Sequence, residues 1–232
     1  RELIKDYGNF RAINGISFEV KEGEIFGLIG PNGAGKTTAL RTIATLLQIT
    51  SGSIKVFDYE LPGEAQEVRK IISYLPEEAG AYKNLTGRDY LNFIAKFFGD
   101  GKKSQGMVRK GLEIANLGER IVDKVDTYSK GMTRRLLVGR ALMVSPKLAI
   151  LDEPTSGLDV VNAQEVRRII NSAVEGGTAV LLSSHNMLEV ELLCHRIALI
   201  SDGKIIARGT AEELKEEYKA GNIEEVFVKA IK

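Results

Sequence analysis

Apolar and polar positions follow two different periods along the chain, and together they predict strands alternating with helices. Residues 16–20 alternate between apolar and polar side chains, which predicts a strand of an antiparallel sheet with one face in water. Residues 25–29, 148–151 and 179–182 are almost wholly apolar, which is typical of strands buried on both faces. Further strands are expected at 53–57, 71–75, 197–200 and 204–207, the last two joined by a hairpin turn at 201–203.

Apolar residues at helical spacing predict helices between and after these strands. One helix is expected after residue 37, where apolar positions recur as far as Leu47. From 77 to 145 no strong strand pattern interrupts predicted helices, so this stretch is expected to be a helical insertion, with Ser129 as the N-cap of its third helix. The expected helices of the insertion are 87–98, 105–115 and 133–144, and the others are 62–70, 160–174, 210–218 and 223–231.

These patterns predict one α/β domain. A chain of 232 residues, 44% of them hydrophobic and 27% charged, is long enough to bury a large core. Residues 1–76 and 146–208 are expected to form the α/β core with an antiparallel β subdomain. Residues 77–145 are expected to form the helical subdomain, and residues 209–232 the C-terminal helices.

The segment Gly30–Thr37 points to a function, because it fits the phosphate-loop pattern G-x-x-x-x-G-K-[ST] without a mismatch. It lies between a predicted strand and a predicted helix, as the motif requires. Consecutive backbone N–H groups at a helix start bind phosphate, and the glycines let the backbone approach it. The alternative, a glycine-rich turn with a solvated lysine, does not account for the full pattern in this setting. The expected nucleotide contacts are Asn32, Gly33, Ala34, Gly35, Lys36, Thr37 and Thr38.

Three side chains have separate expected roles around this loop. Lys36 is expected to reach the β- and γ-phosphates, and the Thr37 hydroxyl is expected to ligate Mg²⁺. Asp152 ends a buried strand, and the carboxyl ends of such strands are where parallel α/β sheets bind ligands. Asp152 is therefore a second expected Mg²⁺ ligand, with a turn-capping aspartate as the alternative reading.

The charge balance, the cysteine content and the lengths of the apolar runs limit which partners and which cellular compartment we expect. Lys and Arg total 32 and Asp and Glu total 31, so no overall basic excess indicates nucleic-acid binding. The single cysteine, Cys194, excludes an internal disulfide and fits a reducing compartment. No apolar run approaches the roughly 18 residues of a membrane span, and no signal peptide is visible, so we expect a soluble chain.

Taken in order, these motifs resemble those of the ATP-binding subunit of ABC transporters along essentially the whole chain. Tyr128–Met132 stands where that family has its signature motif, and Ser156–Asp159 matches its D-loop. His185 matches the switch histidine after the last core strand. Tyr7 falls where the family stacks an aromatic ring on adenine, and an ordinary edge-strand aromatic is the alternative.

The resemblance implies a P-loop NTPase fold, with a RecA-like parallel core, an antiparallel β subdomain and a helical insertion. The sequences of Tyr74–Glu78 and Leu85–Gly87 are most similar to those of drug-exporter-type subunits of the daunorubicin-resistance kind. The function implied is ATP hydrolysis coupled to transport, with export as the expected direction.

The chain departs from the family pattern at three positions. Glu77 stands where the Q-loop glutamine is usual, and a carboxylate there adds negative charge beside a triphosphate. Lys130 replaces the first glycine of the signature pair, and Met132 replaces the usual glutamine. Ser129 and Gly131, which are expected to touch a γ-phosphate held by a partner subunit, are intact.

The resemblance also implies catalytic roles. Glu153 is expected to polarise the attacking water, while His185 holds the γ-phosphate and the water in line, and Lys36 completes the catalytic set. ATP and Mg²⁺ are the expected cofactors, and the expected metal ligands are Thr37, Asp152 and Glu77.

Partners follow from the composite site of the family. Two subunits pack head to tail, so that Ser129 and Gly131 of one chain close over the nucleotide held by the other, and Asp159 of the D-loop is a further expected nucleotide contact. The partner is expected to be a second copy, in a homodimer, or another ABC ATPase subunit, in a heterodimer. Separate transmembrane permease subunits are expected to hold the chain on the inner, cytoplasmic face of the cell membrane. No nucleic-acid partner and no disulfide partner are expected.

Two further features concern contacts outside the nucleotide site. The groove near Ala79–Tyr90 is the expected docking surface for the permease, and Tyr82 and Leu85 are read either as docking residues or as satellite core. Cys194 and His195 lie in an apolar run, are too few for a metal site and are expected to be structural.

Two other functions use the same loop. A phosphotransferase or GTPase would not explain Tyr128–Met132, Asp159 and His185 together. A soluble ABC-type ATPase acting on nucleic acid or ribosomes usually carries a long coiled-coil insertion or tandem ATPase halves. This chain has one set of motifs, no heptad tract and near-neutral charge, so that function stands as the alternative.

Overall fold

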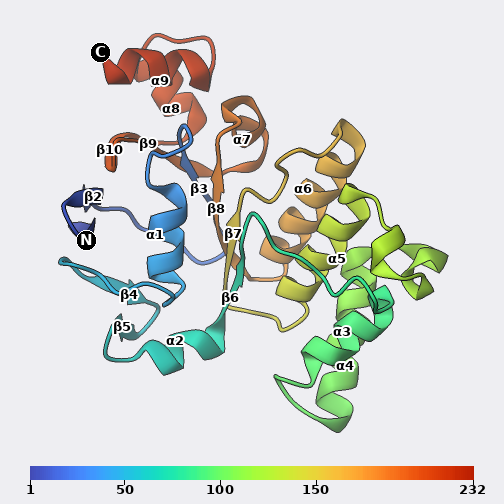
Figure 1. Cartoon of the computed structure of the whole chain (residues 1–232). Helices are drawn as coiled ribbons and strands as arrows, with labels where there is room; N and C mark the ends of the chain where they lie inside the picture. The colour runs from blue at the N-terminus through green and yellow to red at the C-terminus, as the bar shows by residue number, and fades with distance from the viewer.

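The computed structural model describes residues 1–188 and 190–232, and its centre is a mixed sheet with the strand order β10-β9-β3-β8-β7-β6 (Figure 1). The parallel strands are β3 (Ile25–Ile29), β6 (Ile72–Leu75), β7 (Leu148–Asp152), β8 (Ala179–Ser184) and β9 (Arg196–Ser201). At one edge β10 (Lys204–Gly209) runs antiparallel to β9, which confirms the predicted hairpin. The predicted α/β fold with a parallel core is therefore confirmed.

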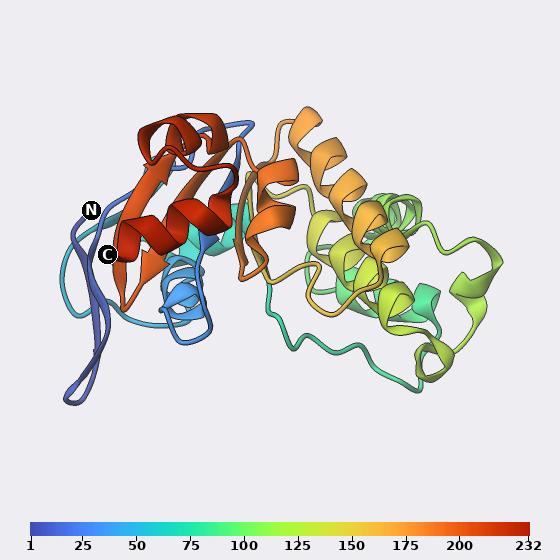
Figure 2. The same cartoon turned by 90° about the horizontal axis from the view of Figure 1, so that it is seen from above.

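Helices flank this sheet and extend beyond one end of it. The α-helices are α1 (Lys36–Ile43), α2 (Ala65–Ile71), α3 (Gly87–Ala95), α4 (Gly101–Ala115), α5 (Lys130–Leu142), α6 (Val160–Glu175), α7 (Met187–Leu193), α8 (Ala211–Glu217) and α9 (Ile223–Ile231). Two short 3₁₀ helices, η1 (Gly118–Val122) and η2 (Val125–Thr127), precede α5. Figure 2 shows α3, α4 and α5 at the opposite end of the molecule from α8 and α9.

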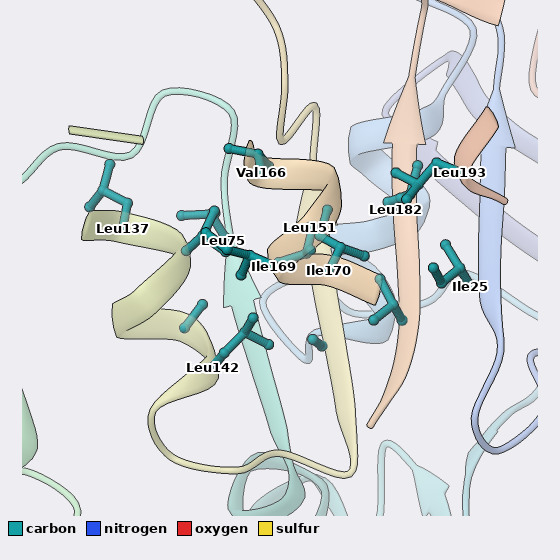
Figure 3. Close-up of a cluster of buried hydrophobic side chains, with 14 of the residues drawn as sticks. Ile25, Leu75, Leu137, Leu142, Leu151, Val166, Ile169, Ile170, Leu182 and Leu193 are labelled. Carbon is teal, nitrogen blue, oxygen red and sulfur yellow. The ribbon is translucent and has the colours of Figure 1, made fainter. Parts of the chain in front are cut away.

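Alternate residues of β3 point to opposite faces of the sheet. Ile25 and Ile29 belong to one buried cluster, and Phe26 and Leu28 belong to another. Figure 3 shows α5 and α6 packing over the first cluster, and residues of α1 belong to the second. Because both faces are covered by helices, nearly every position of the strand has to be apolar, which accounts for the continuous run in the sequence.

The antiparallel part differs from the prediction. β1 (Leu3–Tyr7) pairs with β2 (Phe10–Ile16), and β4 (Ile54–Val56) pairs with β5 (Tyr59–Leu61). The strand predicted at 16–20 is wrong, because in the described part of the chain no strand pairs with residues 17–20. The alternation there reflects packing instead, since Phe18 stacks on Phe26 with ring centroids 5.2 Å apart.

Most predicted helix boundaries differ from the structure by one to four residues, α7 was not predicted, and two of the differences concern the helices next to the nucleotide motifs. The first predicted helix was extended to Leu47, but α1 ends at Ile43, because Thr45 has a φ of 64° and turns the chain out of the helix. The signature helix was predicted from 133, but α5 begins at Lys130, directly after Ser129. The Ser129 side chain accepts a hydrogen bond from the Met132 N–H, which confirms the predicted N-cap.

Helix α5 approaches α4 closely at Gly139, where a Cβ would stand 2.9 Å from the Gly111 carbonyl oxygen. We expect Gly139→Ala to lower the free energy of unfolding by about 1–3 kcal/mol, because backbone atoms have to move apart. The matched control is Gly106→Ala in α4, where a Cβ meets no described atom within 4 Å. That change should raise stability by up to about 1 kcal/mol. Urea unfolding followed by circular dichroism measures both, and an unchanged Gly139→Ala variant would contradict the close contact.

Candidate nucleotide-binding site

The loop between β3 and α1 has the backbone geometry that phosphate binding requires. Gly35, the N-cap residue of α1, has a φ of 104°, and a Cβ there would lie 2.6 Å from the Ala12 carbonyl oxygen, so only glycine fits. The first N–H groups of a helix have no acceptor within that helix, and the helix dipole favours an anion beside them. The predicted contacts at 32–38 therefore surround the positive end of α1.

Lys36 is the cation of this loop, and its side chain folds back over the loop. Its Nζ donates to the carbonyl oxygens of Gly30 at 2.7 Å and of Pro31 at 3.1 Å. The same Nζ lies 3.4 Å from Oε1 of Glu153, and both side chains are buried. The structure thus brings two of the three predicted catalytic residues into an ion pair at the mouth of the loop.

Asp152, at the end of β7, lies at the centre of a hydrogen-bond network. Its Oδ1 accepts from the Thr37 hydroxyl at 3.2 Å and from the Ser183 hydroxyl at 2.5 Å, and its Oδ2 accepts from the Tyr74 hydroxyl at 3.3 Å. Burial raises the pKa of Tyr74, so its hydroxyl stays protonated and serves as a donor. The two side chains predicted to share Mg²⁺, Thr37 and Asp152, are therefore in direct contact.

Glu153 connects this network to the switch histidine. Its Oε2 lies 2.9 Å from Nδ1 of His185, and its backbone N–H donates to the Ser183 hydroxyl at 3.0 Å. Glu153 has a φ of 50°, an uncommon conformation for a residue with a side chain, which turns the carboxylate from the strand end toward the loop. The carboxylate thus stands between Lys36 and His185, the two other residues of the predicted catalytic set.

The signature and D-loop residues cap two adjacent helices. Asp159 is the N-cap of α6, and it accepts from the backbone and side-chain nitrogens of Asn162 at 2.9 and 2.6 Å. These hydrogen bonds lower the pKa of Asp159. Gly131 of α5 packs against Asn162, where a Cβ would stand 2.1 Å from the amide carbon. Ser129 and Asp159 are thereby held by one tightly packed contact between the starts of α5 and α6.

Two predicted site residues stand apart from the phosphate loop. The Glu77 carboxylate lies 3.5 Å from the Ser156 hydroxyl, and within the described part of the structure it makes no hydrogen bond to Thr37 or Asp152. No group of three or more His, Cys, Asp or Glu among the described residues is placed to hold a metal ion. Tyr7, at the end of β1, is 46% exposed, and Lys5 Nζ lies 5.0 Å from its ring centroid, so its ring is open to solvent on a strand edge.

Three residues of this region were missed by the sequence analysis. Ser183 and Tyr74 orient Asp152, and Arg134 of α5 donates from Nη2 to the Glu77 carbonyl oxygen at 2.8 Å. Burial lowers the pKa of Arg134, and the charges of nearby carboxylates act in the opposite direction. For Ser183 a signal existed, since it ends a buried strand, but nothing in the sequence ties Arg134 to a residue 57 positions earlier.

The structure also bears on two predictions outside the site, the structural role of His195 and the absence of a membrane span. The Ile25 N–H donates to Nδ1 of His195 at 3.0 Å, as the structural reading of that histidine requires. Within the described chain, no helix combines the length and the apolar character needed to cross a bilayer.

Comparison with known proteins agrees with this geometry. A family model described as ABC transporter matches residues 13–156. The linearmycin resistance ATP-binding protein LnrL of Bacillus subtilis is 39% identical over 99% of this chain and 74% of its own length. The daunorubicin/doxorubicin resistance ATP-binding protein DrrA of Streptomyces peucetius is 37% identical over 92% of this chain and 65% of its own length.

A solved structure described as the ATP-binding subunit of an ABC transporter has the same fold. It superposes with a TM-score of 0.88 at 27% identity, covering 100% of this chain and 98% of the other. The resemblance inferred from the sequence motifs, including the likeness to daunorubicin-resistance subunits, is thereby confirmed. The chain belongs to the ABC transporter family and is one of its ATP-binding, ATP-hydrolysing subunits.

Proposed function

We propose that this chain powers the export of an antibiotic or drug-like compound, working as a head-to-tail ATPase dimer beneath separate permease subunits. The observation that carries the proposal is the convergence of Lys36, Glu153 and His185 at the end of the phosphate loop. The direction of transport rests on the relatives, because LnrL and DrrA are named for resistance to linearmycin and to daunorubicin or doxorubicin. In this arrangement the chain is peripheral on the cytoplasmic face of the membrane.

Hydrolysis in this proposal uses the buried carboxylate of Glu153 as the group that polarises water. A carboxylate accepts a proton well when it is held in place, and Lys36 and His185 hold this one from two sides. When ATP binds, Lys36 exchanges its loop carbonyls for phosphate oxygens, and His185 keeps the water and the γ-phosphate in line. Glu153 is then left facing the water.

The donor set at Thr37 and Asp152 fits Mg²⁺. A hydroxyl and a carboxylate 3.2 Å apart are hard oxygen ligands, and Ser183 fixes the carboxylate from behind. When bound there, the ion would neutralise charge on the β- and γ-phosphates. Glu77 is retained as a further proposed ligand, although its carboxylate lies beside Ser156 in this structure.

The surface beside Glu153 and His185 is suited to closure by a second subunit. A cavity of about 360 Å³ opens there and is bordered by the D-loop and α7. Val160, Leu188 and Leu192, which line it, are 79%, 49% and 76% exposed, and apolar side chains grouped in this way favour a protein contact. A partner that supplies Ser129 and Gly131 would complete the site, and a homodimer would have two such sites.

Glu153→Gln tests the role of the carboxylate. We expect the variant to bind ATP normally, to lose hydrolysis by about a hundredfold or more, and to accumulate as an ATP-bound dimer. Lys36→Ala is the contrasting variant, because losing the loop cation should remove ATP binding itself. Phosphate release, nucleotide titration and gel filtration measure these outcomes, and normal turnover by Glu153→Gln would remove the residue from this role.

Ser129→Ala tests the composite site. If a partner's Ser129 contacts the γ-phosphate, the variant should hydrolyse ATP about ten- to a hundredfold more slowly while its monomer still binds ATP. Turnover per molecule of the natural chain should also fall on dilution, since a dimer dissociates. Constant turnover at extreme dilution, with a fully active Ser129→Ala variant, would show that one subunit is sufficient.

Aromatic side chains on the helical part offer a docking surface for the permease. Tyr82, Phe93 and Phe97 are 57%, 40% and 70% exposed, and they form a chain of edge-to-face contacts at 5.4 and 5.2 Å. Leu85 differs, because it is partly buried and packs against the core. We therefore retain Tyr82 as a docking residue and assign Leu85 to satellite core.

We expect the variants Tyr82→Ser and Phe97→Ser to pull down at least about threefold less of a multi-span membrane protein than the natural tagged chain does. The reason is that exposed aromatic anchors contribute much of the binding energy of a protein contact. The matched control is Phe10→Ser, which also changes an exposed aromatic, 65% exposed, but at the start of β2. Quantitative pull-down from detergent-solubilised membranes measures recovery. Equal recovery with all variants would place docking elsewhere, and stimulation of hydrolysis by nucleic acid would favour the soluble ATPase alternative.

A further inference from the structure

Arg134 is a buried cation that neither the family motifs nor the catalytic set explains. It lies on α5, one turn after Ser129, and only 7% of it is exposed. Its Nη2 donates to the Glu77 carbonyl oxygen at 2.8 Å, while its Nη1 is buried without a hydrogen-bond partner among the described residues. Burying a guanidinium is costly unless opposite charge lies nearby, so one hydrogen bond to a carbonyl does not account for it.

The opposite charge comes from the ATP site itself. The groups whose charges act on the Arg134 guanidinium are the carboxylates of Glu77, Asp152 and Glu153. Against these three negative charges the region contains the ammonium of Lys36, which lies 3.4 Å from Glu153. Arg134 is therefore a second buried cation on the side of the site facing α5, where Glu77 enters from β6.

This placement bears on Glu77, where the chain departs from the usual glutamine. A carboxylate at this position adds a third negative charge to those that act on the Arg134 guanidinium, on the α5 side of the proposed triphosphate site. We propose that Arg134 is the positioning residue and counter-charge of Glu77: it anchors the backbone at that residue and offsets the added charge, so that a carboxylate is compatible with nucleotide binding. The inference rests on the proposed function, in which ATP binds at the phosphate loop and Glu77 faces it.

Two separable effects follow from this arrangement. The hydrogen bond is made to the backbone of residue 77, so anchoring by Arg134 does not depend on the side chain there. Charge compensation does depend on it, because a glutamine at position 77 carries no charge. A double-mutant cycle between the two positions therefore isolates the electrostatic part.

The cycle uses the full chain and the variants Glu77→Gln, Arg134→Gln and the double variant. ATP affinity is measured in EDTA with a fluorescent ATP analogue, where no metal ion screens the carboxylates. We expect Arg134→Gln to weaken binding about five- to tenfold when Glu77 is present, and less than about twofold when residue 77 is glutamine. Arg134→Lys, which keeps the charge, should stay within about twofold of the natural chain.

The matched control is Arg135→Gln, the same change one residue along α5. Arg135 donates to the carbonyl oxygen of Asn116, directly after α4, at 3.1 Å and not to Glu77, so this variant should change affinity less than about twofold. Circular dichroism and urea unfolding check that each variant is folded. If Arg134→Gln is the one single variant that does not fold, a folded double variant supports the assignment. An unfolded double variant, together with weak ATP binding by Arg134→Lys, contradicts it.

An equal loss of affinity in both backgrounds would overturn the charge role and leave Arg134 a packing residue. Weak binding by Arg134→Lys would have the same consequence, because that variant keeps the cation. These results differ from failure of the proposed function, which would appear as absence of ATP binding or hydrolysis in the natural chain. Normal ATP binding together with an additive cycle would reject the Arg134 assignment alone.

Discussion

The contact on which the site depends is the one between Asp152 and Thr37, 3.2 Å apart across the end of the sheet. Two segments more than a hundred residues apart meet there because β8 lies between β3 and β7, so all three strands end at one edge. Ser183, at the end of β8, fills the space between them and binds Asp152. Because these strands are parallel, the glycine loop after β3 and the acidic end of β7 meet at one edge of the sheet and form a single polar site.

The carboxylates at this site are buried, so their negative charges have to be balanced by neighbouring groups. Asp152 and Glu153 are 1% and 4% exposed, and carboxylates at that depth need cations or donors around them. Hydroxyl groups satisfy Asp152, whereas Glu153 is held by Lys36 and His185. In the proposed mechanism a triphosphate engages Lys36 and His185, so the contacts that hold the Glu153 carboxylate are available for exchange when nucleotide binds.

The helical part is connected to this site by a few long side chains from α5. Arg134 binds the Glu77 carbonyl oxygen at 2.8 Å, and Arg140 binds the Tyr74 carbonyl oxygen at 3.4 Å. Tyr74 lies in β6 and Glu77 lies two residues after its end, and the Tyr74 hydroxyl itself donates to Asp152. A shift of α5 would thus reach Asp152, the proposed Mg²⁺ ligand, through the backbone of one short segment, which gives the proposed composite site a physical route for coupling.

Much of the protein was determined by local sequence. The apolar runs, the glycines of Gly30–Thr37 and the cap Ser129 specified the parallel strands, the turn into α1 and the N-cap of α5, because each depends mainly on neighbouring residues. Tertiary structure alone decided that residues 17–20 have no strand beside them, since pairing depends on what lies next to a segment. It also decided that Arg134 faces Glu77, because contacts between residues far apart in the chain arise from packing and leave no periodic signal in the sequence.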